Sequence, residues 1–272
     1  MWHSNDPLGG TIGTDVDVLF SRSTNDGATW SGPISILPYA DSDSSDDRNM
    51  RLATDRAGRW IGVYDTENTL GGTIGSDRDV LYVVSTDNGA SWSAPAPLNT
   101  NAASDSGSDV NARVVHVTGD IYVAAWTSTD TLGGTISASN NILFSRTTDG
   151  GVTWSAPAPL QSNANDGSTE VEPYLACAAD GTCIAVWSST NSLGGTVGTD
   201  RGVMFARSTD GGATWSATAL LNSNGTSDTT VDDFAGISTD GNGSWLAVWS
   251  SRDYFWRYHR HRTRSALQPL HR

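Results

Sequence analysis

The stretch STDGGATW at residues 208–215 is the last of four copies of one eight-residue phrase. The earlier copies are STNDGATW at 23–30, STDNGASW at 85–92 and TTDGGVTW at 147–154. Their closing tryptophans lie 62, 62 and 61 residues apart. This period is too long for a heptad or a leucine-rich repeat and equals one four-stranded unit, so it predicts a β-propeller or a similar array.

The second repeat shows the pattern of one unit most fully. Residues 49–55 and 60–65 are predicted to form two strands joined by a short turn. A glycine-rich loop at 69–77 follows them. A third strand is expected at 79–85, and 92–98 is an edge-like fourth strand because it contains two prolines. Four antiparallel strands in one period make one propeller blade.

The eight-residue phrase is predicted to form the turn between the third and fourth strands. Its Asp accepts hydrogen bonds from nearby backbone N–H groups, and its glycine permits a positive φ. The first copy has Asn25 in the acid column, with Asp26 beside it. Asp, Asn and Gly also recur in calcium loops, but the distal glutamate ligand is missing, so we expect a structural turn, no metal and no cofactor. The turn residues are Ser23, Asn25, Gly27, Trp30, Ser85, Asp87, Gly89, Trp92, Thr147, Asp149, Gly151, Trp154, Ser208, Asp210, Gly212 and Trp215.

Ten of the eleven tryptophans follow the same period in three columns. An aromatic-rich acidic protein also suggests sugar-stacking platforms, but repetition in register favours packing in the core for most of these rings.

Composition excludes some partners. The formal charge of −14 repels nucleic-acid phosphates, so we expect no nucleic-acid role. No stretch is long and apolar enough to insert in a membrane, and the first ten residues lack the regions of a signal peptide.

The phrase resembles the Asp-box, or BNR, repeat of bacterial sialidases, whose pattern is Ser/Thr-x-Asp-x-Gly-x-Thr-Trp/Phe. Copies three and four match at every position, while copy two has Ser91 for Thr and copy one has Asn25 for Asp. The resemblance implies an all-β, sialidase-like propeller over residues 1–251, a glycan or cell-surface ligand, and an extracellular or cell-surface location. The box marks the fold and also occurs in proteins that are not sialidases.

Sialidase chemistry, as the resemblance implies it, needs three arginines, a tyrosine nucleophile paired with a glutamate, and an aspartate acid/base. No Arg-Ile-Pro tripeptide is present, so no catalytic residue can be assigned. Two classes of function stay open. The uniformity of the blades favours a glycan-binding or scaffold module, and the alternative is a retaining exo-sialidase that releases terminal sialic acid.

Residues that vary within the period give the candidate ligand site. Arg51, Arg113 and Tyr174 occupy one column of the first strands, and Glu172 lies two residues earlier, on the face that simple alternation assigns to the same side. If these strands line a central channel, the four side chains converge there. The competing interpretation, solvated channel residues left by drift, is favoured.

Cys177 and Cys183 flank a short turn centred on Asp180, which would place them opposite each other. Either a disulfide or two buried thiols fits. The disulfide is favoured because the resemblance implies an exported protein.

The tail at residues 252–272 departs from the repeat, because it is rich in Arg and His and has no periodicity. Permitted codons for Phe255–His271, read one base out of frame, can yield the missing loop, strand and box opening in register. We therefore expect an altered reading frame rather than an evolved basic tail. The sequence predicts three complete blades flanked by two half-blades, either a truncated arc of a larger propeller or a closed four-bladed ring.

Overall fold

A computed structural model describes residues 2–198, 200–223, 225–226, 229–252 and 264–270. Within them every regular element is a strand, and no helix is present that is long and apolar enough to cross a membrane. Each eight-residue box lies between the last two strands of its sheet.

Three sheets have four strands each, and consecutive strands pair antiparallel throughout. The first of these sheets contains β4 (Asp47–Thr54), β5 (Trp60–Thr66), β6 (Asp79–Ser85) and β7 (Ala96–Pro97). The next contains β8 (Asp109–Thr118), β9 (Ile121–Ser128), β10 (Asn141–Thr147) and β11 (Ala158–Pro159). The third contains β12 (Glu170–Cys177), β13 (Cys183–Ser189), β14 (Gly202–Ser208) and β15 (Ala219–Leu220). They match the three complete repeats.

A three-stranded sheet lies at each end of the series. The N-terminal one contains β1 (Trp2–Ser4), β2 (Asp17–Phe20) and β3 (Ile34–Ser35). The C-terminal one contains β16 (Asp232–Thr239), β17 (Trp245–Ser251) and β18 (Arg264–Leu270).

The third strand of the last sheet corrects one prediction. The backbone of β18 pairs with β17 so that Trp245 faces Leu270, the register in which Cys183 faces Ser208 one repeat earlier. The prediction that this repeat ends after two strands is therefore wrong. An open strand edge offers a row of unpaired N–H and C=O groups that an extended segment of almost any sequence can satisfy. The altered reading frame stays a prediction, and residues 253–263, on which much of it falls, lie outside the described part.

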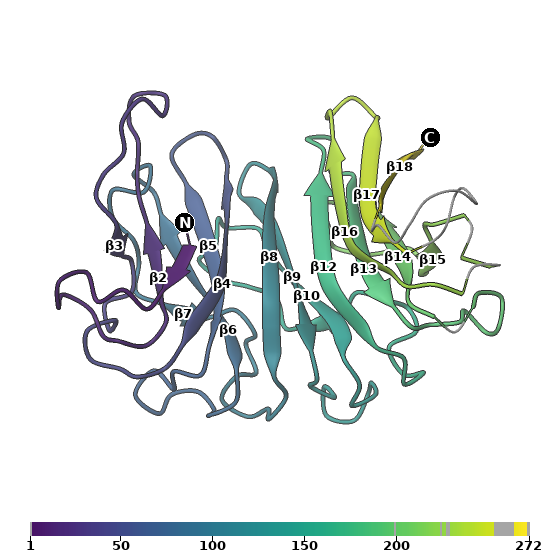
Figure 1. Ribbon diagram of the computed structural model, residues 1–272, viewed down its shortest axis with the longest axis horizontal. Coiled ribbons are helices and arrows are strands. Elements are labelled where there is room, and N and C mark those ends of the chain that lie inside the picture. Colours follow the sequence, from purple (N-terminus) through teal and green to yellow (C-terminus); the bar gives the residue numbers. More distant parts are fainter. Residues whose placement is uncertain (1, 199, 224, 227–228, 253–263, 271–272) are drawn as a thin grey trace.

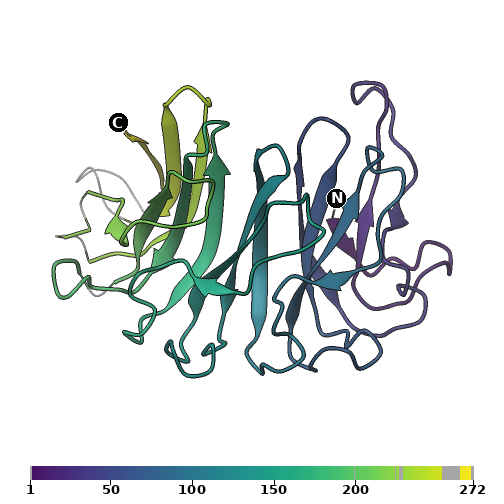
Figure 2. The same cartoon turned by 180° about the vertical axis from the view of Figure 1, so that it is seen from behind.

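The sheets stand side by side in an arc, with the first and last at opposite ends in both views (Figures 1 and 2). The first strands of the four later sheets, β4, β8, β12 and β16, run next to one another along its inner side. The predicted all-β array of antiparallel sheets is thus confirmed.

Each inner strand carries a β-bulge at the same place. The pairing register shifts between Arg48 and Arg51 in β4, and the residue after Arg48, Asn49, has a φ of 57°. Equivalent positive φ values occur at Asn111, Glu172 and Phe234. One extra residue interrupts the simple alternation on which the expected convergence of side chains depended, so the bulge decides where they point.

The box tryptophans pack between sheets. Trp92 meets the ring of Phe20 edge-on, with ring centroids 6.1 Å apart, and Trp154 and Trp215 meet Tyr82 and Phe144 in the same way. Trp30 belongs to the first sheet of the series and is 65% exposed. The expectation that most of these rings pack in the core is confirmed, since Trp154 is buried and Trp92 and Trp215 pack against core clusters, and their ring partners belong to the preceding sheet.

The aspartate of the box stabilises its own turn through hydrogen bonds. Asp149 Oδ1 accepts hydrogen bonds from the Thr147 hydroxyl and from the backbone N–H groups of Val152 and Thr153, and Oδ2 accepts one from the Thr153 hydroxyl. Asp87 and Asp210 repeat this pattern. In the first copy the Asn25 amide oxygen accepts from Ser23 and Thr29, and the amide nitrogen donates to the Thr29 hydroxyl.

We expect Asp149→Ala to lower the free energy of unfolding by about 1–2 kcal/mol, because four hydrogen bonds to a charged acceptor are lost at a partly exposed site. The matched variant Asn25→Ala should cost less, since a neutral amide makes weaker bonds. Urea unfolding of both variants measures the difference, and equal losses would contradict this account.

The same contribution should depend on pH. Hydrogen bonds from the Thr153 hydroxyl and N–H and the Thr147 hydroxyl lower the pKa of Asp149 to about 2, against about 4 in the unfolded chain. Because the folded pKa is the lower one, the stabilisation is present above pH 4 and is lost as the pH falls towards 2. The difference in unfolding free energy between wild type and Asp149→Ala should shrink between pH 5 and 2.5. A constant difference would refute the assignment.

Candidate functional site

The inner strands enclose the candidate site. Because four equivalent strands lie side by side, their C-terminal halves and the turns that follow surround a cavity of about 760 Å3. Its lining takes one segment from each strand, at 52–56, 114–118, 174–179 and 237–241.

Two of the predicted ligand residues meet beside this cavity. Tyr174 lines it and is 42% exposed. The guanidinium carbon of Arg113, on the neighbouring strand β8, lies 5.0 Å from the centre of the Tyr174 ring. This is a cation–π distance. The buried Nε of Arg113 has no hydrogen-bond partner, so part of the guanidinium's donor capacity is unused.

The other two predicted residues lie apart from the cavity lining. Arg51, on β4, is exposed and donates from a terminal nitrogen to the carbonyl of Met50. Glu172 lies near the ion pair of Arg201 with Asp233, whose closest N–O distance is 3.0 Å. Burial, and then repulsion from Asp233, raise the pKa of Glu172, while Arg201 opposes the shift. Of the four predicted residues, the structure therefore brings Arg113 and Tyr174 into contact, while Arg51 and Glu172 each have other partners.

Two further arginines precede the third strands and are held by acids. Arg78 pairs with the buried Asp65 at 3.5 Å and with Glu67 at 3.2 Å. Arg201 is held by Asp233. Neither belongs to the described lining of the cavity, in which Arg56 is the arginine present.

The comparisons now identify the family. The sequence model described as "BNR repeat-like domain" matches residues 11–264. The chain belongs to this family.

Solved structures similar to this BNR repeat-like protein share its fold at low sequence identity. A protein of unknown function from Dyadobacter fermentans matches with a TM-score of 0.58 and 17% identity, over 89% of this chain and 66% of that one. The intramolecular trans-sialidase of Ruminococcus gnavus matches with 0.56 and 14%, over 95% and 51%. An endo-arabinase of Bacteroides thetaiotaomicron matches with 0.51 and 15%, over 99% and 88%. The chain thus spans about half to two thirds of the length of the first two.

None of the curated proteins matches the sequence. The family match nevertheless confirms the Asp-box resemblance that the four phrases predicted.

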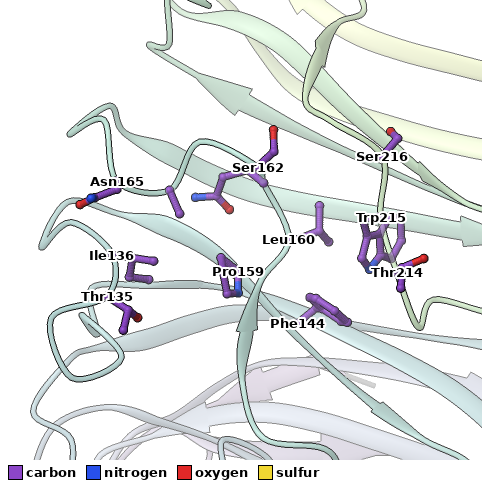
Figure 3. Close-up of a pocket in the computed structure, with 12 residues that line it drawn as sticks. Thr135, Ile136, Phe144, Pro159, Leu160, Ser162, Asn165, Thr214, Trp215 and Ser216 are labelled. Atoms are coloured by element: carbon purple, nitrogen blue, oxygen red, sulfur yellow. The ribbon is translucent and has the colours of Figure 1, made fainter.

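A second hollow of this BNR repeat-like protein, of about 430 Å3, lies between the third repeat and the fourth box (Figure 3). The rings of Phe144 and Trp215 lie next to each other at one end of it, and none of the residues that line it is charged. Since these two rings already form the contact between sheets, we regard the hollow as a by-product of that packing.

One of the two cysteines, Cys177, lines the larger cavity. Cys177 and Cys183 are opposite each other in the register and are joined by a disulfide, with 2.02 Å between the sulfurs. The bond closes the hairpin whose first strand contributes Tyr174.

Sequence reasoning missed two acidic groups, because it considered metal ligands only in the boxes. Asp15, Asp17 and Asp43 form one group, and Asp77, Asp79 and Asp105 form the other. The signal was an Asp-x-Asp pair just before or at the start of the third strand in two repeats only.

Proposed function

We propose that this BNR repeat-like chain is a glycan-binding module whose ligand carries a carboxylate. The observation that carries the proposal is the stacking of the Arg113 guanidinium on the partly exposed ring of Tyr174 beside the cavity. An aromatic ring offers an apolar face to a sugar, and a guanidinium binds a carboxylate through two parallel hydrogen bonds.

Position within the repeat supports Arg51 as a second contact. It holds in β4 the place that Arg113 holds in β8, since both residues follow the bulge and pair with the second strand. The side chain is exposed, and its described hydrogen bond is to the adjacent carbonyl of Met50, so binding a ligand disrupts no ion pair.

Structurally similar proteins favour a saccharide ligand. The Ruminococcus gnavus trans-sialidase is described in complex with oseltamivir carboxylate, and the Bacteroides protein is an endo-arabinase. An acidic ligand such as oseltamivir carboxylate fits the two arginines of this chain better than a neutral arabinan does.

The second candidate function is hydrolysis of terminal sialosides, with Tyr174 as nucleophile and Glu172 as its partner. Its support is the raised pKa of Glu172 two residues from an exposed tyrosine. We favour binding, because Glu172 faces Arg201 and Asp233 and its Oε2 has no hydrogen-bond partner.

An extracellular or cell-surface location goes with this proposal. The Cys177–Cys183 disulfide supports it, because such bonds persist mainly in oxidising compartments.

We predict that the double variant Arg51→Ala, Arg113→Ala weakens binding of a sialyl oligosaccharide at least tenfold, because both carboxylate contacts are removed. Isothermal titration measures the affinity. The control is Arg207→Ala, which removes an exposed arginine of β14 outside the cavity lining and should leave the affinity unchanged. Undiminished binding by the double variant would place the site elsewhere.

A fluorogenic sialoside separates binding from catalysis. We expect no turnover by the wild-type chain. Turnover that disappears in Tyr174→Phe would overturn the binding proposal and establish the hydrolase.

A further inference from the structure

The two acidic groups occupy the same place in successive repeats, 62 residues apart. In each, one carboxylate comes from the loop before the third strand, one from the first residue of that strand, and one from the loop that leads to the next sheet. In the second repeat these are Asp77, Asp79 and Asp105. One oxygen from each carboxylate lies within 4.8 Å of the other two, close enough to share one ion.

The central carboxylate of each group is fully buried and has at least one oxygen without a partner, although Oδ1 of Asp79 accepts a hydrogen bond from Asn99. Asp17 has no exposed surface, and neither of its oxygens has a hydrogen-bond partner. Asp79 has none exposed either, and its Oδ2 is unpartnered. Buried polar atoms are rarely left in this state, because the loss of water is not offset.

The outer carboxylates also have buried oxygens without a hydrogen-bond partner. The unpartnered buried oxygens include one from Asp15 and one from Asp43 in the first group, and one from Asp77 and one from Asp105 in the second. Within the described residues, none of these acids forms an ion pair with an arginine, so the converging carboxylates lack a compensating positive charge.

The third repeat shows what fills this place when the two acids at the start of the third strand are absent. Ser139 stands for Asp77 and Asn141 for Asp79. The Asn141 amide nitrogen donates to the carbonyls of Ser137 and Ser139, both at 2.9 Å, and its oxygen accepts from Gln161. The positively polarised NH2 group of Asn141 thus occupies a site lined by carbonyl oxygens.

The glycine that begins the motif changes together with the acid. A Cβ on Gly75 would lie 2.4 Å from Oδ1 of Asp77, so the carboxylate folds over the glycine and would have to move if residue 75 carried a side chain. Gly13 and Asp15 show the same relation, at 2.3 Å. Where the acid is replaced, in the third repeat, the glycine is replaced by Ser137.

We propose that Asp15, Asp17 and Asp43 bind one Ca2+ ion and that Asp77, Asp79 and Asp105 bind a second. The ligand atoms are all oxygens, which suits a hard cation, and Ca2+ accepts irregular sets of carboxylates and carbonyls more readily than Mg2+ does. The carbonyls of Gly75 and Asp77 correspond in the repeat to those that hold the Asn141 amide and would complete the second site.

Such an ion would join the start of a third strand to the loop that leads into the next inner strand. In the second site that strand is β8, which carries Arg113. The inference is independent of the proposed ligand, because it concerns how neighbouring sheets are fixed to each other.

The test titrates chelator-treated full-length protein with CaCl2, followed by calorimetry and by thermal unfolding at constant ionic strength. Wild type should bind two ions and unfold at a higher temperature with Ca2+ than with an equal ionic strength of NaCl or MgCl2. Asp17→Asn and Asp79→Asn should each lose one ion, and the double variant both. Since Asn141 shows that an amide fits this backbone, the double variant should unfold at a higher temperature than the chelated wild type.

Asp41→Asn is the matched control, because Asp41 is an exposed acid of the same loop as Asp43, and it should retain two ions. Asp105→Asn replaces Asp79→Asn if the latter fails to fold. A wild type that binds no Ca2+ in the millimolar range, or a double variant that still binds two ions, would overturn the proposal. An equal response to all three salts would overturn it as well.

Discussion

The contact between a box and the sheet before it is the interaction on which the rest of the molecule depends. A single blade buries little by itself, and an array of sheets becomes stable only when neighbouring faces cover each other. Here the tryptophan that ends a box makes the contact with the preceding sheet. Trp154 packs edge-on against Tyr82, and Trp215 packs edge-on against Phe144. The glycine of the box permits this approach, since a Cβ on Gly151 would lie 2.8 Å from the side chain of Ile61.

Much of the fold was predictable, because the residues that make these contacts recur with the period of the repeat. The spacing of Trp30, Trp92, Trp154 and Trp215 predicted sheets of four strands, and the Asp-box pattern predicted the family. The strand at Arg264–Leu270 was not predictable from side chains, because an open sheet edge can recruit a backbone that carries no repeat signal.

The candidate site was predicted only in part, for a geometric reason. Alternation in extended strands suggested that Glu172 and Tyr174 share a face, but Glu172 lies within the bulge, where the pairing register shifts between Val171 and Tyr174. Tyr174 accordingly lies in the cavity lining, while Glu172 lies by Arg201 and Asp233. The acidic groups were missed for another reason: Asp43 and Asp105 lie far in sequence from the strands they approach, and no local pattern joins them.

The bulge has a consequence for how such a protein can change. Its extra residue belongs to no pair of the ladder, so its side chain can be exchanged without disturbing the hydrogen bonds that hold the sheet together. The four inner strands keep one frame yet present Asn49, Asn111, Glu172 and Phe234 at this position, an amide twice, then an acid, then an aromatic ring. Because the backbone there already adopts a left-handed conformation, which favours asparagine and glycine, each departure from them costs local strain, and a change at Asn49 also loses its hydrogen bond to the buried Asp65. New side-chain chemistry can therefore arise at this point of each blade while the architecture stays constant.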